Sequence, residues 1–242
     1  MRTQIIKRTA LAVASASVVL MYAAWKPTPS ADKLIKKNGW VSLFDGKTTK
    51  GWHSYNKTGP VAGWEAKDGV LASVETSYEA TNADIVSDKE YTNFEFAWEW
   101  RIGKGSNSGV MYHVVEDAKY PTTFTTGPEY QLIDEVGWDG PLEDWQKAGC
   151  DYAMHLPNDK KVLKPVGEWN TSKIVFNKGH VEHWLNGAKI LEFEAWTDEW
   201  NKKRTEGKWK EYPAYGAAKT GRIALQAHGG KVAFRNIKIK EL

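Results

Sequence analysis

Cysteine is almost absent from this 242-residue chain, which contains only Cys150. A single cysteine cannot form an internal disulfide or supply the paired thiolates of a structural zinc site. The sequence also lacks the HExxH motif of zinc hydrolases, the GxSxG turn of α/β-hydrolases and the glycine-rich P-loop. His180 and His183 lie three residues apart on a predicted strand, so they point to opposite faces. These absences exclude the enzyme classes that depend on such motifs.

Long apolar runs are also absent, apart from residues 9–24 near the N-terminus. Arg2, Lys7 and Arg8 precede this run, and a polar, proline-containing segment follows it. This order is typical of a secretory signal peptide. We therefore predict export to the periplasm or to the extracellular space.

The alternative is an uncleaved N-terminal anchor, because no small-x-small cleavage site ends the apolar run. No lipobox cysteine is present, which argues against lipid attachment. In an exported protein, Cys150 is expected to be a buried apolar residue rather than a redox centre. The sequence thus predicts a signal peptide with a short linker at residues 1–32 and one folded domain at residues 33–242.

An excess of charge of one sign is absent outside the N-terminus. The chain has 33 basic and 30 acidic residues, and the three basic residues of the N-terminal segment account for its net charge of +3. Proteins that bind nucleic acid or anionic lipid depend on clustered positive charge. We therefore expect neither nucleic acid nor, apart from the N-terminal segment, a membrane as a partner.

Alternation of apolar and polar residues dominates the rest of the chain. In residues 94–102, the aromatic side chains fall on one face and Glu95, Glu99 and Arg101 on the other, as the two-residue period of a strand requires. Similar patterns predict strands at residues 109–115, 129–134, 171–176, 180–185, 189–193, 221–228 and 231–239. The chain is therefore predicted to be all-β.

Turn signals separate these strands, and Asp68-Gly69 and Asn186-Gly187 are the strongest. No pattern indicates a helical crossover between parallel strands. We therefore predict an antiparallel sandwich of two sheets. The connections at residues 138–150 and 195–215 are long, and loops of such length usually have a function or carry a helical turn.

Tryptophan is unusually frequent, with 13 copies. Trp98 and Trp100 share the core-facing register of their strand, which indicates packing. Five others lie in loops among polar residues, namely Trp138, Trp145, Trp196, Trp200 and Trp209. For these we consider both packing and a role in stacking on sugar rings.

Three predicted strands each place a polar pair opposite their apolar residues. The pairs are Glu99 with Arg101, Glu129 with Gln131, and Gln226 with His228. A carboxylate on a sheet face is costly if dry and unpaired, so it is either solvated or functional. We consider both a solvated sheet face and a shared polar cleft, to which a bulge would add Asp134. The acid-rich loop at residues 134–144 is either a Ca²⁺ site or a solvated loop.

Several motifs occur in order between residues 40 and 242. They are LFDGK (43–47) before GW (51–52), YTNFEFAWEWR (91–101), GSNSG (105–109), GPEYQLID (127–134), KP (164–165), GEWN (167–170), VEHWLNG (181–187), IALQAHG (223–229) and FRNI (234–237). Together they resemble the 3-keto-disaccharide hydrolase domain family. The resemblance implies a concanavalin-like lectin/glucanase jelly roll that bacteria export and that acts on glycosides oxidised at C3 of one sugar.

The activity implied by this resemblance is an elimination. A ketone at C3 acidifies the C2 proton, so a base can remove that proton and expel the C1 substituent, after which water adds to the enone. The route needs a base, an acid for the leaving oxygen, and a cation or hydrogen-bond donors for the enolate oxygen. It does not need the two flanking carboxylates of an ordinary glycosidase.

The matched motifs also imply site residues. Glu129 and His228 are the expected base and acid, in either order, and Arg101 is expected to stabilise the enolate. The expected substrate-binding residues are Glu99, Asn107, Tyr112, Gln131, Asp134, Trp138 and Gln226. Arg235 and Asn236 lie in a matched motif and are either functional or structural.

No cofactor is predicted, and the alternative is a divalent cation such as calcium bound by Glu99, Glu129 and Asp134. Cys150 and the connection at residues 138–150 do not fit the family pattern. The resemblance therefore assigns no residues to the leaving-group side of the pocket.

Two other functions use the same cleft. An ordinary β-glucanase would employ Glu129 and Asp134 as its carboxylate pair and would hydrolyse unoxidised glucans. A non-catalytic carbohydrate-binding module would use the cleft and the loop tryptophans without any base. The expected ligand in each case is a glycoside or oligosaccharide.

Overall fold

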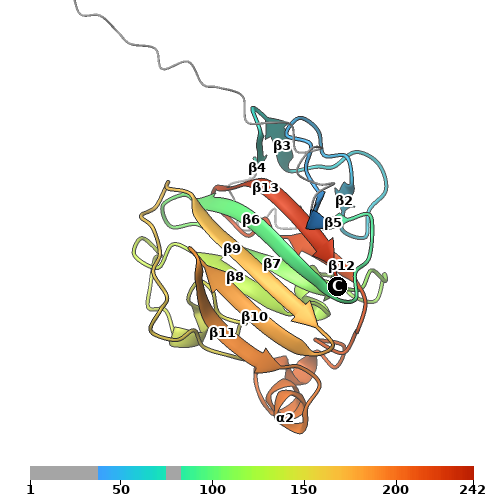
Figure 1. Ribbon diagram of the computed structural model, residues 1–242, viewed down its shortest axis with the longest axis vertical. Helices are drawn as coiled ribbons and strands as arrows, with labels where there is room; N and C mark the ends of the chain where they lie inside the picture. Colours follow the sequence, from blue (N-terminus) through green and yellow to red (C-terminus); the bar gives the residue numbers. More distant parts are fainter. Residues whose placement is uncertain (1–37, 75–82) are drawn as a thin grey trace, which may run out of the picture.

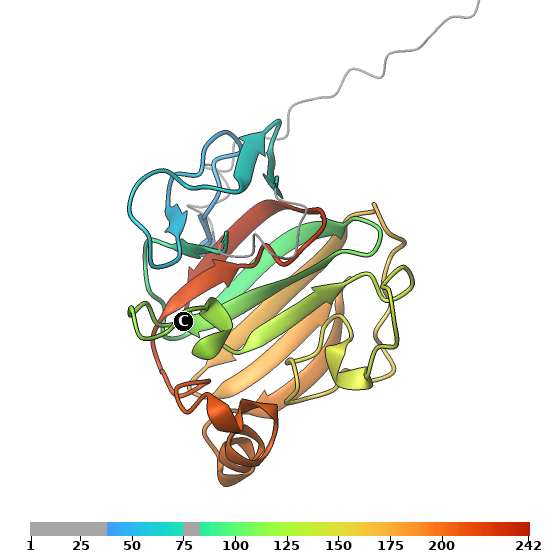
Figure 2. The same cartoon turned by 180° about the vertical axis from the view of Figure 1, so that it is seen from behind.

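The computed structural model describes residues 38–74 and 83–242. They form two antiparallel sheets that pack face to face, seen from opposite sides in Figures 1 and 2. The predicted two-sheet sandwich is confirmed. The predicted signal peptide and linker at residues 1–32 lie outside the described residues. Within the described ranges, no helix has both the length and the apolar character needed to cross a membrane.

The larger sheet has eight strands in the order β11-β10-β9-β6-β13-β4-β3, and β1 pairs with β13. Its strands are β1 (Val41–Ser42), β3 (Trp64–Lys67), β4 (Val70–Ser73), β6 (Phe94–Ile102), β9 (Asn170–Asn177), β10 (His180–Leu185), β11 (Ala188–Glu194) and β13 (Val232–Glu241). Strands β6 and β13 lie side by side at its centre (Figure 1). The centre of this sheet therefore pairs a strand from the middle of the chain with the C-terminal strand.

The smaller sheet has five strands in the order β2-β5-β12-β7-β8. They are β2 (Trp52–Ser54), β5 (Ile85–Ser87), β7 (Asn107–Val114), β8 (Glu129–Ile133) and β12 (Arg222–Leu225). Because β7 lies between β12 and β8, segments about a hundred residues apart in sequence become neighbours on one face. Two strand spacings, about 9.5 Å, separate β12 from β8.

Alternation decides which side chains enter the space between the sheets. In β6, every second residue is buried, and Trp98 and Trp100 are at most 2% exposed. The predicted packing role of these two tryptophans is thus confirmed. In β8, Tyr130 and Leu132 lie in the same core, so Glu129 and Gln131 face away from the larger sheet.

A buried polar relay connects the two sheets. The Trp100 Nε1–H donates to Ser172 Oγ at 2.9 Å, and the Ser172 hydroxyl donates to the Tyr130 hydroxyl at 3.0 Å. Tyr130 in turn donates to the Trp184 carbonyl at 3.2 Å. Because each buried donor finds an acceptor, the relay connects β8 to β6, β9 and β10, and its hydrogen bonds offset the cost of burying these polar groups.

Both predicted hairpin turns are present. Asn186 and Gly187 have φ values of 48° and 88°, and Asp68 and Gly69 have values of 51° and 80°. Two consecutive positive φ angles define the type I′ turn that suits the twist of paired strands.

The two long connections contain short helices, as their lengths indicated. The first includes the 3₁₀ helix η3 (Asp144–Gln146), and the second includes the α-helix α2 (Asp198–Glu206) and the 3₁₀ helix η4 (Lys208–Glu211). Thr197 begins α2 by accepting a hydrogen bond from the Trp200 amide at 3.2 Å. Figure 1 shows α2 at the lower end of the sandwich.

Candidate active site

A pocket of about 470 Å³ opens on the outer face of the five-stranded sheet. This volume lies within the range of about 300–1,000 Å³ that is typical of small-molecule sites. Its lining residues are Tyr55, Asp84, Asn107, Thr122, Phe124, Glu129, Gln131, Tyr152, Lys208, Trp209, Tyr212, Gln226, Ala227 and His228. Five of the residues predicted from the sequence are among them, namely Asn107, Glu129, Gln131, Gln226 and His228.

Strand β7 forms the middle of the pocket floor. Its Gly109 pairs with Gln131 of β8, and a side chain at position 109 would overlap the Glu129 carboxylate. The glycine therefore leaves the space that this carboxylate occupies above the sheet. Glu129 and His228 flank β7, because Glu129 belongs to β8 and His228 follows β12.

Glu129 is a buried acid, only 6% exposed. Within the described residues, no hydrogen bond reaches its carboxylate. Burial raises its pKa to about 8, and the charge of Lys208 opposes that shift while Asp84 and Asp151 add to it. At neutral pH this side chain therefore mostly retains its proton.

The pKa of His228 shifts in the opposite direction. Burial, aided by the charge of Lys208, lowers the pKa of its imidazole. The ring is therefore predominantly neutral at pH 7 and can accept a proton. The pocket thus contains one group that holds a proton at neutral pH and one that does not.

Asp84 holds the segment that carries His228. Its carboxylate accepts hydrogen bonds from the Thr123 hydroxyl at 2.5 Å and from the Ala227 amide at 3.0 Å. The second bond explains why β12 ends at Leu225 and not at residue 228 as predicted, since the Ala227 amide bonds to a side chain instead of a neighbouring strand. Burial raises the pKa of Asp84 to about 6.

Lys208 brings a positive charge to the pocket. Its Nζ lies 4.1 Å from the centroid of the Tyr152 ring and 5.4 Å from that of Trp209. Contacts between an ammonium group and aromatic faces are attractive and hold the side chain over the rings. The charge is near enough to lower the pKa values of both Glu129 and His228.

Two buried amide oxygens in the pocket have no partner within the described residues. They are Asn107 Oδ1 and Gln226 Oε1. Such atoms usually have a partner in a working protein, because leaving them unpaired costs about 1–3 kcal/mol.

Comparison with known proteins agrees with this picture. Residues 39–240 match the model of the 3-keto-alpha-glucoside-1,2-lyase-like domain. The chain belongs to this family. A 3-keto-disaccharide hydrolase of Bacteroides thetaiotaomicron is 30% identical over 233 residues, which cover 86% of this chain and 80% of that protein.

Solved structures give the same result. A Parabacteroides distasonis protein assigned to the glycosyl hydrolases is 43% identical, with a TM-score of 0.80 over 89% of this chain and 98% of its own. A second protein of that organism with the same assignment is 29% identical, with a TM-score of 0.66 over 85% and 100%. The predicted family and jelly-roll fold are thus confirmed, and the relatives support a carbohydrate-active enzyme that cleaves glycosides.

In this lyase-like domain, Arg101 and Glu99 lie far from the expected position. Both belong to β6 in the larger sheet, and neither lines the pocket. The Arg101 guanidinium lies 4.9 Å from the centroid of the Trp169 ring. Glu99 accepts hydrogen bonds from Arg235 at 2.8 Å and from Asn236 at 2.6 Å. Alternation gave the correct face of β6 but not its sheet, so the structure places Arg101 and Glu99 in surface contacts outside the pocket.

Three further expected residues also lie outside the pocket. Tyr112 is fully buried between the sheets, because it occupies the core-facing phase of β7. Asp134 accepts hydrogen bonds from the amides of Gly105, Val136 and Gly137 at 2.8–3.1 Å, so it closes a loop. Trp138 is half-buried and packs against the core. The structure therefore does not bring these three residues into the pocket with Glu129.

The carboxylates expected to bind a cation are likewise not together. Among the described residues, the only group of three potential ligands within 4.8 Å of one another is His180, Glu182 and Glu192 on the larger sheet. Lys189 already contacts Glu182 at 3.1 Å and Glu192 at 2.5 Å. The acid-rich loop at residues 134–144 provides no such group in the described structure.

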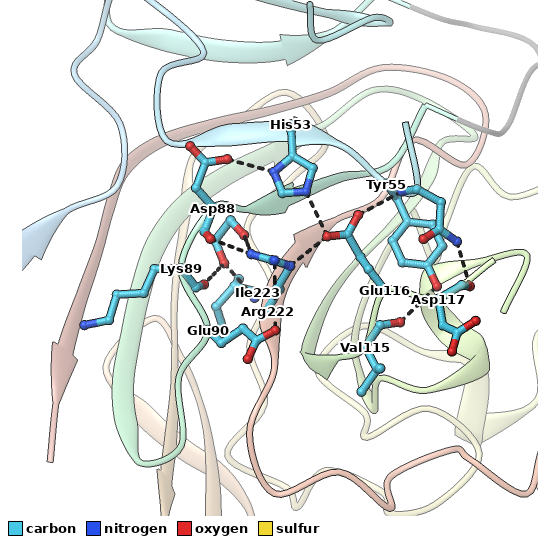
Figure 3. Close-up of polar contacts among 12 residues, drawn as sticks. His53, Tyr55, Asp88, Lys89, Glu90, Val115, Glu116, Asp117, Arg222 and Ile223 are labelled. Carbon is cyan, nitrogen blue, oxygen red and sulfur yellow. Dashed lines mark hydrogen bonds and ion pairs between the residues drawn. The ribbon is translucent and has the colours of Figure 1, made fainter. Parts of the chain in front are cut away.

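A second polar cluster lies on the outer face of the five-stranded sheet in the lyase-like domain (Figure 3). His53 lies between two carboxylates, with Nδ1 2.7 Å from Asp88 and Nε2 2.9 Å from Glu116. Arg222 Nε lies 2.7 Å from the same Glu116 carboxylate. We call these four residues the paired cluster, because each of them contacts a group of opposite charge when His53 is protonated.

Neither Asp84 nor Lys208 was predicted from the sequence alone as a pocket residue. Asp84 precedes a strand of only three residues, too short for alternation to be recognised. Lys208 lies in a helical connection whose position depends on tertiary packing. One signal was available, since the neighbouring Trp209 belongs to the group of loop tryptophans considered for sugar stacking.

Proposed function

We propose that this protein cleaves glycosides oxidised at C3 of one sugar, by elimination followed by addition of water. The observation that carries the proposal is the opposite protonation of Glu129 and His228 in one pocket beside the positive charge of Lys208. An elimination needs a group that holds a proton, a group that accepts one and a cation. Glu129, His228 and Lys208 can meet these three requirements within one pocket.

The protonation states assign the roles. Neutral His228 removes the C2 proton, and the electron pair moves toward the C3 oxygen, where the charge of Lys208 stabilises the enolate. Glu129 donates its proton to the C1 oxygen as the C1–O bond breaks and a C1–C2 double bond forms. Water then adds at C1 and a proton returns to C2, so the net reaction is hydrolysis.

The remaining lining residues suit a sugar. The amide side chains of Asn107, Gln131 and Gln226 line the pocket and suit hydrogen bonding to the hydroxyl groups of a sugar ring. Phe124 and Tyr212 line the pocket and are partly exposed, and the centroids of their rings lie 5.9 Å apart. Such a mixture of aromatic faces and a few fixed polar atoms is usual in small-molecule sites.

The two alternatives are less well supported. An ordinary glucanase was expected to pair Glu129 with Asp134, and Asp134 is bound to backbone amides outside the pocket. The other carboxylate that lines the pocket, Asp84, already accepts hydrogen bonds from the Thr123 hydroxyl and the Ala227 amide. A binding module has no use for an acid whose pKa is displaced to about 8, and such shifts are concentrated at catalytic sites.

Paired substrates test the proposal. The protein is incubated with an aryl 3-keto-glucoside and with the matching unoxidised glucoside, and release of the aryl group is measured. Release from the keto substrate alone is expected. Release from the unoxidised substrate would indicate a glucanase, and saturable binding without release would indicate a binding module.

The proposal includes export, which rests on the signal-like residues 1–24. We expect the mature N-terminus between residues 16 and 32. Intact-mass measurement of protein from its native source checks this. A mass that retains residues 1–24 would indicate an N-terminal anchor instead.

A further inference from the structure

A second, more open hollow of about 560 Å³ adjoins the pocket and shares Lys208 with it. Trp145, Met154 and Leu156 supply apolar surface there, and Glu143 and Asp144 supply exposed carboxylates. Trp145 belongs to η3, in the connection at residues 138–150 that does not fit the family pattern. This connection is therefore part of the surface around the site.

The hollow lies on the Glu129 side of the pocket. The segment at residues 149–152 runs along the free edge of β8, where the Tyr152 amide donates to the Glu129 carbonyl at 3.0 Å and the Gly149 amide donates to the Gln131 carbonyl at 2.8 Å. The Gln131 side chain also donates from Nε2 to the Gln146 carbonyl at 3.1 Å. The turn that carries Trp145 is thus tied to the pocket floor, across Glu129 from His228.

Aromatic rings continue from the pocket into the hollow. The centroid of the Trp209 ring lies 6.2 Å from that of Tyr152, which lies 5.2 Å from that of Trp145. Lys208 Nζ lies 5.2 Å from the Trp145 centroid as well. A ligand that leaves the pocket past Glu129 therefore meets an aromatic surface immediately.

We propose that this hollow binds the sugar ring of the leaving group, with Trp145 as its stacking platform. The inference rests on the proposed function, because Glu129 as the proton donor to the C1 oxygen places the leaving group on its own side of the pocket. Aromatic rings pack well on the apolar faces of sugars. The carboxylates of Glu143 and Asp144 can accept hydrogen bonds from the hydroxyl groups of such a ring, which favours a sugar over a purely aromatic leaving group.

Substrates with different leaving groups test this inference. We compare kcat/KM for a 3-keto-disaccharide and for methyl 3-keto-glucoside in the wild type and in Trp145→Ala. The ratio of the two values is expected to fall roughly tenfold in the variant, which corresponds to the loss of one stacking contact. Trp145→Phe retains an aromatic face and should restore most of the ratio.

Trp169→Ala is the matched control, because Trp169 lies under Arg101 and Arg235 on the larger sheet. The control should leave the ratio unchanged. An unchanged ratio in Trp145→Ala would overturn the proposal, whether both rates stay the same or both fall together.

Binding separates failure of the subsite from failure of the proposed function. If wild-type protein cleaves neither keto substrate, the proposed function fails, and titration with the unoxidised disaccharide and methyl glucoside still tests the hollow. Tighter binding of the disaccharide that is lost in Trp145→Ala would support the subsite. Equal binding of the two sugars by the wild type would overturn it.

Discussion

The outer face of the five-stranded sheet has two polar ends that differ in how their charges are satisfied. Along β5 and β12 the outward residues run from Asp84 through Val86 to Asp88, and from Gln226 through Ala224 to Arg222. Val86 and Ala224 belong to an apolar cluster with Tyr55, Met111 and Val114, which separates the ends. The same face and similar residue types therefore serve two different purposes.

At the end that carries the paired cluster, each charge has a partner within about 3 Å (Figure 3). At the pocket end, no hydrogen bond from the described residues reaches the Glu129 carboxylate, and two amide oxygens have no partner. The pKa values of Glu116 and Glu129 consequently shift in opposite directions. Hydrogen bonds and the charges of His53 and Arg222 lower the pKa of Glu116 despite its partial burial, and burial raises that of Glu129. Paired charges stabilise the fold, whereas Glu129, which has no hydrogen-bond partner among the described residues, is the acid that the proposed mechanism uses.

The largest expected effect is on activity at the pocket end. Glu129→Gln and His228→Ala should each reduce release from a 3-keto glycoside about a hundredfold to ten-thousandfold, as loss of a general acid or base does. Circular dichroism should show an unchanged fold. Glu116→Gln serves as the control with the same chemical change at the other end. Turnover of both pocket variants within a few-fold of wild type would mean that the active site lies elsewhere.

The next effect is a gain of stability in Glu129→Gln at high pH. Below pH 4.5 the carboxyl is protonated in both the folded and unfolded states. Between pH 4.5 and about 8 only the unfolded state has lost the proton, so wild-type stability falls by up to about 1.4 kcal/mol per pH unit. Glutamine does not titrate, so the free energy of unfolding of the variant should exceed that of wild type increasingly up to pH 8. Denaturant melts at pH 4, 6 and 8 measure this, and parallel curves would refute the buried protonated acid.

The free energy of unfolding of Glu116→Gln should change in the opposite direction, and by a smaller amount. The lowered pKa of Glu116 means that the ionised group contributes stability above pH 4.5, which is lost as the pH falls through the folded-state pKa. The variant should therefore be about 1–3 kcal/mol less stable at pH 7, a typical cost for losing hydrogen bonds to charged groups. The deficit should shrink in acid. A deficit that persists unchanged at pH 3 would show that lost packing, not charge, is responsible.

Arg101→Met should have the smallest effect. Its guanidinium contacts the half-buried ring of Trp169 beside the other sheet, an interaction worth about 0.5–1 kcal/mol. We expect kcat/KM within about twofold of wild type. A hundredfold loss of kcat with an intact fold would show that Arg101 takes part in catalysis after all.

Alternation within single strands predicted much of this arrangement. It placed Glu129 and Gln131 on one face, and Gln226 and His228 on another, and the fold brings both faces into one pocket. It also placed Trp98 on the face of its strand that packs in the core. These predictions succeeded because the direction of a strand side chain is a local property.

The expected site residues that lie outside the pocket are those whose position depends on long-range strand pairing. Nothing local distinguishes β6 from β8, yet one belongs to the larger sheet and the other to the smaller, so Arg101 and Glu129 point in opposite directions away from the sandwich. Lys208 reaches the pocket only because η4 packs beside Tyr152. Tertiary placement of a helical connection leaves no periodic pattern in the sequence.

Measuring the incorporation of solvent deuterium at C2 tests the central claim most directly. The protein cleaves a 3-keto glycoside in D₂O, and the product is analysed by NMR at short times, with a control for exchange without enzyme. Elimination through His228 removes the C2 proton and later returns one from solvent, so one deuterium at C2 is expected for each bond cleaved. Release of a product that retains protium at C2 would contradict the proposed mechanism and would indicate direct hydrolysis at C1.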